Sequence, residues 1–129
     1  MGSVKTFEDL DVWKKAIELI EKIYKITKVQ PFSKDFGLVD QVRRASISIA
    51  ANIAEGMERD GNKELINFLY IAKGSCGEII CHIHIARRLE YIDNCLFSEI
   101  YNFAIEISRA LGKFIHYLKE SNLRGKKYK

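Results

Sequence analysis

Residues 38–55 read LVDQVRRASISIAANIAE, and this stretch decides the fold because its apolar side chains recur at the spacing of an α-helix. The core stripe of this helix consists of Leu38, Val42, Ala45 and Ile49. Small residues are frequent between positions 45 and 54, so a neighbouring helix can approach closely. We therefore expect a buried helix that begins at Asp35 or Leu38 and runs to Glu55, with Gly56 as its C-terminal stop.

A similar periodicity occurs upstream, in residues 8–29. This segment ends before Pro31, whose ring cannot continue a helix. Two neighbouring apolar stripes run along it, one with Trp13, Ile17, Ile20, Tyr24 and Thr27 and the other with Ala16, Leu19, Ile23 and Ile26. Two stripes indicate that more than one face of this helix is buried.

Two further helical segments follow, at residues 62–90 and 95–121. Asp60-Gly61 is a turn signal, and Asn62 is the expected N-cap of the third helix. Inside that helix, Gly74 and Gly77 predict a close approach of another helix. Four helices with short connections pack antiparallel in chain order. The sequence thus predicts an all-α protein, an antiparallel up-down-up-down four-helix bundle at residues 7–121, followed by a basic flexible tail at residues 122–129.

The charge of the chain is unevenly distributed. The 129 residues have a formal net charge of +4, from 21 basic and 17 acidic residues. Residues 119–129, KESNLRGKKYK, hold five basic residues and one acidic residue, and so carry the whole excess. The other 118 residues hold 16 of each sign. A body-wide electrostatic signature of nucleic-acid binding is absent, whereas a local one remains at the C-terminus.

Targeting and redox signals favour a cytoplasmic protein that does not enter a membrane. No apolar run approaches the roughly 18 residues that cross a bilayer, and MGSVKTFEDL lacks the apolar core of a signal peptide. Cys76 and Cys81 lie inside an apolar helical pattern, and Cys95 makes the number of cysteines odd. We interpret them as reduced, core-type residues without a disulfide framework.

Three segments resemble the signature segments of one bacterial family. They are residues 7–13 (FEDLDVW), 41–56 (QVRRASISIAANIAEG) and 68–75 (FLYIAKGS). Over residues 7–120 the chain resembles the four-helix-bundle proteins encoded in intervening sequences of 23S rRNA genes, together with the accessory variability protein of diversity-generating retroelements. The resemblance implies a left-handed bundle that assembles into a ring-like homopentamer. The retroelement members bind nucleic acid and a reverse transcriptase through basic outer surfaces.

A polar ridge interrupts the apolar character of residues 38–55. It consists of Gln41, Arg44, Ser48, Asn52 and Glu55, which share one helix face. Arg44 and Glu55 are about 16 Å apart along the axis and cannot pair with each other. Ser75 and Glu78 on the third helix are candidate partners. We interpret these seven residues as a buried hydrogen-bonded network, and the alternative is a ligand or nucleic-acid contact through Arg44.

Metal binding and catalysis find little support in the sequence. His82 and His84 are two positions apart, so they point to opposite sides of a helix and cannot hold one ion. No Glu-x-x-His pair of the kind that di-iron bundles use is present. Neither a nucleophile with an adjacent base nor a Gly-rich phosphate loop is found. We expect no metal, no cofactor and no enzymatic activity.

The basic residues suggest a binding role. The candidate nucleic-acid contacts are Arg43, Arg44, Arg124, Lys126, Lys127 and Lys129, of which the last four flank an aromatic residue in the tail. Arg87, Arg88 and Arg109 are expected on solvated faces with local acidic partners. The predicted function is a non-catalytic, homopentameric scaffold that associates with RNA, DNA or a nucleic-acid-processing partner protein. A protein-interaction module without a nucleic-acid role is the alternative, and a small-molecule or metal-binding bundle is a third. The subunit interface is expected on the first helix and on the small-residue face around Ile53.

Overall fold

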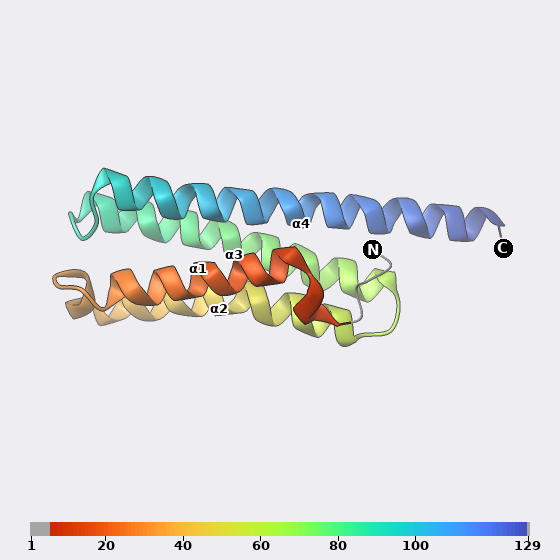
Figure 1. Ribbon diagram of the computed structural model, residues 1–129, viewed down its shortest axis with the longest axis horizontal. Helices are drawn as coiled ribbons and strands as arrows, with labels where there is room; N and C mark the ends of the chain where they lie inside the picture. Colours follow the sequence, from red (N-terminus) through yellow and green to blue (C-terminus); the bar gives the residue numbers. More distant parts are fainter. Residues whose placement is uncertain (1–5, 129) are drawn as a thin grey trace.

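The computed structural model describes residues 6–128, with side chains for residues 6–121. Its four α-helices are α1 (Asp11–Thr27), α2 (Phe36–Glu58), α3 (Asn62–Arg88) and α4 (Asn94–Tyr128), and two 3₁₀ turns are η1 (Phe7–Asp9) and η2 (Phe32–Lys34). The described residues form no strand. The helices lie side by side and run alternately up and down (Figure 1). The predicted four-helix bundle is confirmed.

Local hydrogen bonds explain where the first helices begin. Glu8 and Asp9, predicted as the start of the first helix, belong to η1 instead, and the Thr6 N–H donates to Asp9 Oδ2 at 3.1 Å. The carboxylate of Asp35 caps α2, because Oδ1 accepts from the Leu38 N–H at 3.1 Å. In α3 the N-cap is Gly61, with φ at 88°, and Asn62 is the first helical residue, so the prediction of Asn62 as N-cap was one position late.

Gly56 lies inside α2 and does not end it. The helix continues to Glu58, and Gly56 is buried where α2 packs against the first turns of α3. A Cβ at this position would lie 2.9 Å from Leu65 Cδ1 and 2.9 Å from Phe68 Cβ. The predicted stop is therefore wrong, because close helix packing explains the glycine. Gly74 and Gly77, by contrast, are not in close contact with another helix of the chain. Apart from the backbone of α3 itself, a Cβ at either position would meet no heavy atom within 4 Å.

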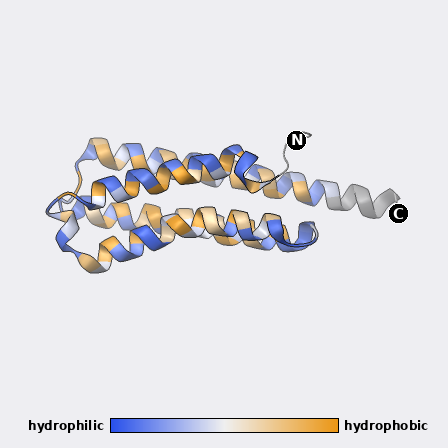
Figure 2. Ribbon diagram, turned by 60° about the horizontal axis from the view of Figure 1, so that its bottom comes forward, coloured by the Kyte–Doolittle hydropathy of each residue, from blue (hydrophilic) through white to orange (hydrophobic). Residues whose placement is uncertain are grey.

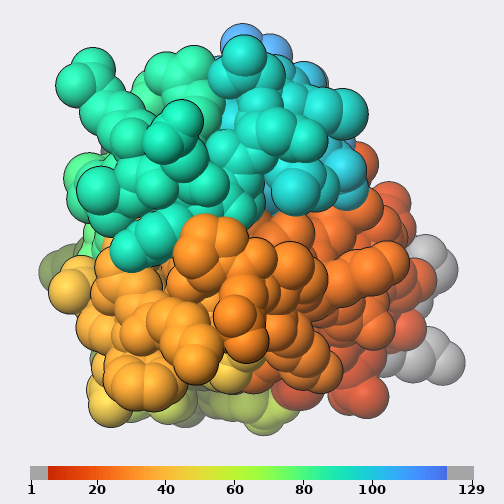
Figure 3. All heavy atoms as spheres, turned by 90° about the vertical axis from the view of Figure 1, so that its left-hand side faces the viewer, coloured from red at the N-terminus to blue at the C-terminus, as the bar shows by residue number. Residues whose placement is uncertain are grey.

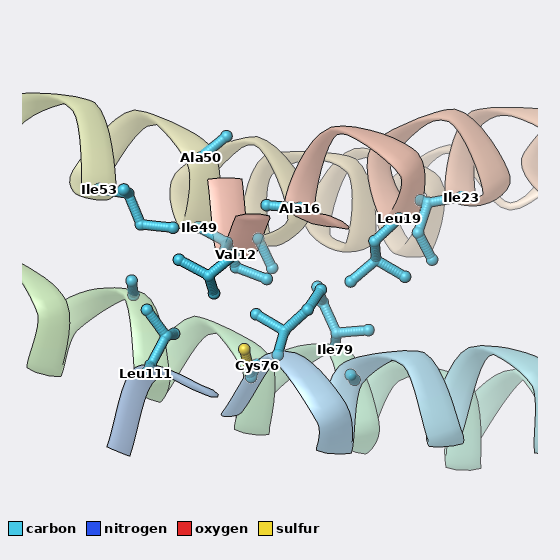
Figure 4. Packing of buried hydrophobic residues seen from close by; sticks show 14 of the residues in the cluster. Val12, Ala16, Leu19, Ile23, Ile49, Ala50, Ile53, Cys76, Ile79 and Leu111 are labelled. Carbon is cyan, nitrogen blue, oxygen red and sulfur yellow. The ribbon is translucent and has the colours of Figure 1, made fainter. Parts of the chain in front are cut away.

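The core runs the length of the bundle between the four helices. In α1 the buried stripe is Val12, Ala16, Leu19, Ile23 and Thr27. Trp13, Ile17 and Ile20 are only half-buried at its edge, so the stripe that contains them is not the one facing the centre. Ile49 and Ile53 of α2 point towards Cys76, Ile79 and Leu111 (Figure 4). Coloured by hydropathy, the helices alternate apolar and polar segments (Figure 2).

Three residues predicted for particular environments lie elsewhere. Ile53 is completely buried in the core of its own chain, so it cannot belong to an interface between chains. Cys81 is exposed, as is Cys95, and only Cys76 is a core residue. Burial raises the pKa of the Cys76 thiol to about 12. The described helices include none that is long and apolar enough to cross a membrane.

One end of the bundle is closed by the connections between helices. The α1–α2 connection lies against the α3–α4 connection in the end view (Figure 3). The Tyr91 hydroxyl donates to Asp35 Oδ2 at 2.9 Å, and the rings of Phe32 and Tyr91 are 5.2 Å apart. Phe32 is fully buried. This contact joins the two halves of the molecule at that end.

Candidate nucleic-acid interface

Two residues of the predicted polar ridge, Ser48 and Asn52, are hydrogen bonded to each other, and Ser48 is also bonded to the predicted partner Ser75 of α3. The Ser75 hydroxyl donates to Ser48 Oγ at 3.0 Å, and Asn52 Nδ2 donates to the same oxygen at 2.9 Å. Ser75 is almost fully buried, while the other two are half-buried. These bonds satisfy polar groups next to the core and define the register between the two helices.

The charged members of the ridge pair along their own helix. Arg44 Nε lies 2.9 Å from Asp40 Oδ2, and Arg59 Nε lies 3.2 Å from Glu55 Oε2, each one helical turn apart. Such exposed pairs contribute little to stability. Arg44 and Ser48 also line a shallow groove, together with Gln41, Glu78 and His82. The seven predicted residues therefore do not form a single network.

His82 is the buried polar residue of this groove. Only 7% of it is exposed, and its Nδ1 has no hydrogen-bond partner among the described atoms. Burial lowers the pKa of His82 from its ordinary value, although the nearby carboxylate of Glu78 acts in the opposite direction. The groove thus favours a neutral imidazole. Within the described chain, no three metal-binding side chains come together.

Arg43, a predicted nucleic-acid contact, is engaged inside the chain. Its Nε donates to Thr27 Oγ1 at 2.9 Å, and its guanidinium lies 4.3 Å from the ring centroid of Tyr24. Both partners belong to the end of α1, so Arg43 joins α2 to α1. The predicted tail contacts Arg124, Lys126, Lys127 and Lys129 have side chains outside the described residues.

Two lysine–glutamate pairs join α1 to α4. Lys15 Nζ lies 2.5 Å from Glu106 Oε2, and Lys22 Nζ lies 2.6 Å from Glu99 Oε2. The two ammonium groups flank the ring of Phe103, at 5.4 and 5.2 Å from its centroid. The hydrogen bond to Glu106 raises the pKa of Lys15. The first two acidic residues of α4 are thereby directed towards α1.

A different surface lies along the junction of α3 with α4, which we call the α3–α4 seam. It consists of Tyr70, Lys73, His84 and Arg87 from α3 and Phe97, Tyr101 and Lys119 from α4. Lys119 Nζ donates to Tyr70 Oη at 2.7 Å and lies 5.1 Å from that ring. The Arg87 guanidinium lies 4.6 Å from the Phe97 ring centroid. Two cations of the α3–α4 seam therefore lie over aromatic rings of the neighbouring helix.

The basic residues of α3 and α4 differ from those of α1 in their partners. Lys73, Arg87, Arg88, Arg109, Lys113 and Lys119 form no ion pair with any carboxylate that the structure describes. The expectation that Arg87, Arg88 and Arg109 have local acidic partners was therefore wrong. From sequence alone these residues are expected on ordinary solvated faces, because the positions of the carboxylates relative to them depend on how the helices pack.

Comparisons with known proteins agree with this architecture. A family model described as 23S rRNA-intervening sequence protein matches residues 8–113. A crystal structure from Bacteroides thetaiotaomicron VPI-5482, a protein of unknown function from the S23 ribosomal protein family, is 30% identical to this chain. The match covers 81% of this chain and 97% of the other, with a TM-score of 0.74. Comparison with curated proteins found no match. With its four helices and a family match over most of its length, the chain belongs to the 23S rRNA-intervening sequence proteins.

Proposed function

We propose that this protein is a non-catalytic, homo-oligomeric scaffold that associates with nucleic acid in the cytoplasm. The observation that carries the proposal is the row of cations on α3 and α4 that lack carboxylate partners among the described residues. Unpaired lysine and arginine side chains bind phosphates and release the counterions that surround them. The resemblance to the retroelement accessory protein supports the same reading, and the relation to that protein is part of the proposal.

Self-association is supported by apolar residues on the outer surfaces of α2 and α3. Ile47 is 44% exposed, Ile71 is 51% exposed and Ile85 is 41% exposed. Gly74 lies between the latter two in α3, with open space around it. A helix that is apolar on more than one side buries its second side against a partner. We propose that this partner is another copy of the chain, and the resemblance points to five copies.

Binding to RNA and DNA tests the nucleic-acid part of the proposal. We expect a fluorescein-labelled single-stranded oligonucleotide to bind the full chain at 50 mM salt and to bind much more weakly at 200 mM. A chain that ends after Asn122 removes the predicted tail and measures the contribution of the bundle alone. Absence of binding by the full chain at 50 mM would remove nucleic acid from the proposed function.

The second candidate function is a protein-interaction module without a nucleic-acid role. The exposed isoleucines of α2 and α3 favour it, because such residues are typical of protein contacts. In that case the full chain binds no oligonucleotide at either salt concentration. A partner protein then binds through the exposed isoleucines Ile47, Ile71 and Ile85 alone. The same titration therefore separates the two candidates.

A further inference from the structure

We infer that the α3–α4 seam binds single-stranded nucleic acid, with its cations on the phosphates and its exposed ring against a base. This inference rests on the proposed function and specifies where on the molecule the nucleic acid lies. It places the contacts on Lys73, Arg87 and Lys119, and not on Arg43 or Arg44, which were the candidates within the bundle.

The distribution of carboxylates makes the seam locally positive although the bundle as a whole is neutral. Glu99 and Glu106 of α4 are paired with lysines of α1. Glu78 of α3 lines the groove shared with α2. These three carboxylates therefore face α1 or α2, and Glu120 of α4 lies 3.9 Å from His116 of the same helix. Lys73, Arg87 and Lys119 have no carboxylate within 4.0 Å among the described side chains. Separation of charge to different faces creates a field that the net charge does not reveal.

Aromatic rings hold two of these cations in place. Lys119 lies over Tyr70, and Arg87 lies over Phe97, whose ring also contacts His84 at 4.8 Å between centroids. A ring orients a cation without neutralising it, so the charge remains available to a phosphate. Tyr70 is 48% exposed, which leaves ring surface for a base. Stacking on aromatic rings and on arginine planes is how proteins bind unpaired bases.

The length of the seam suits an extended strand. Tyr70 and Arg87 are 17 positions apart in one helix, which is about 25 Å at 1.5 Å per residue. A single strand laid along this line reaches all three cations. A duplex keeps its bases stacked inside and offers none to Tyr70. The geometry therefore favours single strands over duplexes.

The test uses the full chain and two variants with the same loss of charge. The seam variant carries Lys73→Gln, Arg87→Gln and Lys119→Gln, and the control carries Lys14→Gln, Lys25→Gln and Lys28→Gln, three exposed lysines of α1 and its end. Labelled single-stranded RNA, DNA of the same sequence and the matching duplex are titrated between 50 and 200 mM salt. Circular dichroism verifies that both variants are folded.

We expect the seam variant to bind single strands at least ten-fold more weakly than the control. Each lost phosphate contact should make the slope of log affinity against log salt shallower by roughly 0.7. Loss of three contacts should therefore make it shallower by about two. Tyr70→Ala should weaken binding about five-fold or more without changing the slope. Equal binding of RNA and DNA is expected, because the contacts are to phosphates and base rings, which both have, and not to the 2′-hydroxyl of RNA.

Four outcomes would overturn the inference. If seam and control variants weaken binding equally, the nucleic acid binds elsewhere and the proposed function still holds. If the duplex binds as tightly as the single strand, or Tyr70→Ala binds like the unchanged chain, base stacking at the seam is wrong. If the unchanged chain binds nothing at 50 mM salt, the proposed function fails as well.

Discussion

A Cβ atom at Gly56 would overlap Leu65 and Phe68, whereas a Cβ at Gly74 would meet open space. We predict that Gly56→Ala lowers the free energy of unfolding by about 1–2 kcal/mol, because the crossing of α2 and α3 must open. Gly74→Ala, the matched control, should raise it by about 0.5–1 kcal/mol through helix propensity alone. Urea denaturation followed by circular dichroism measures both. Equal effects of the two substitutions would show that the α2–α3 crossing is looser than described.

His82 should make the fold sensitive to acid. Burial lowers its pKa in the folded state below the ordinary 6.5, so the unfolded chain binds a proton more readily. The resulting stability is fully present above pH 6.5 and is lost as the pH falls below that value towards the folded pKa. Glu78, Arg44 and Gln41 line the same groove, and the Glu78 carboxylate limits the effect.

The check on His82 compares two proteins at two pH values. Urea midpoints at pH 7.5 and 5.5 should fall further for the natural chain than for His82→Leu, which cannot take up the proton. His84 and His116 are exposed and present in both proteins, so their contributions cancel. A His82→Leu chain that loses as much stability as the natural one would show that this imidazole is not responsible.

At the scale of elements, the two lysine–glutamate pairs between α1 and α4 are one heptad apart and enclose Phe103. We predict that Glu106→Lys lowers the melting temperature modestly, since it places two ammonium groups together at an exposed site. The double change Lys15→Glu with Glu106→Lys should restore most of the loss, because the pair is re-formed in reverse. A double variant that melts no higher than Glu106→Lys would mean that the pair does not join the helices.

The helices were largely predictable from periodicity, whereas the contacts between them were not. The spacing of Leu38, Val42, Ala45 and Ile49 was sufficient for α2. In α1, however, two stripes of equal period competed, and only packing decides that Leu19 and Ile23 face the centre while Ile17 and Ile20 lie at the edge. Pairs one turn apart, such as Asp40 with Arg44, follow from spacing. The pair of Lys15 with Glu106 depends on a register across 91 positions that a single sequence does not define.

At the scale of the whole molecule, the candidate site could be predicted only in part. A neutral bundle and a basic C-terminus directed attention to the tail. In the folded chain Glu99 and Glu106 lie on the side of α4 that faces α1, whereas Lys119 lies on the side that faces α3. The α3–α4 seam arises from that separation, so a count of charges along the chain conceals it. The exposed isoleucines of α2 and α3 likewise become visible as a surface only after the core is assigned.

The most direct test of the account is the mass of the protein in solution, measured by light scattering after size exclusion, with and without single-stranded RNA. We predict about 75 kDa for the free protein, five times the chain mass of 14.9 kDa, and a larger mass when RNA is present at low salt. A species of 14.9 kDa whose mass does not change on addition of RNA would contradict both the assembly and the nucleic-acid association.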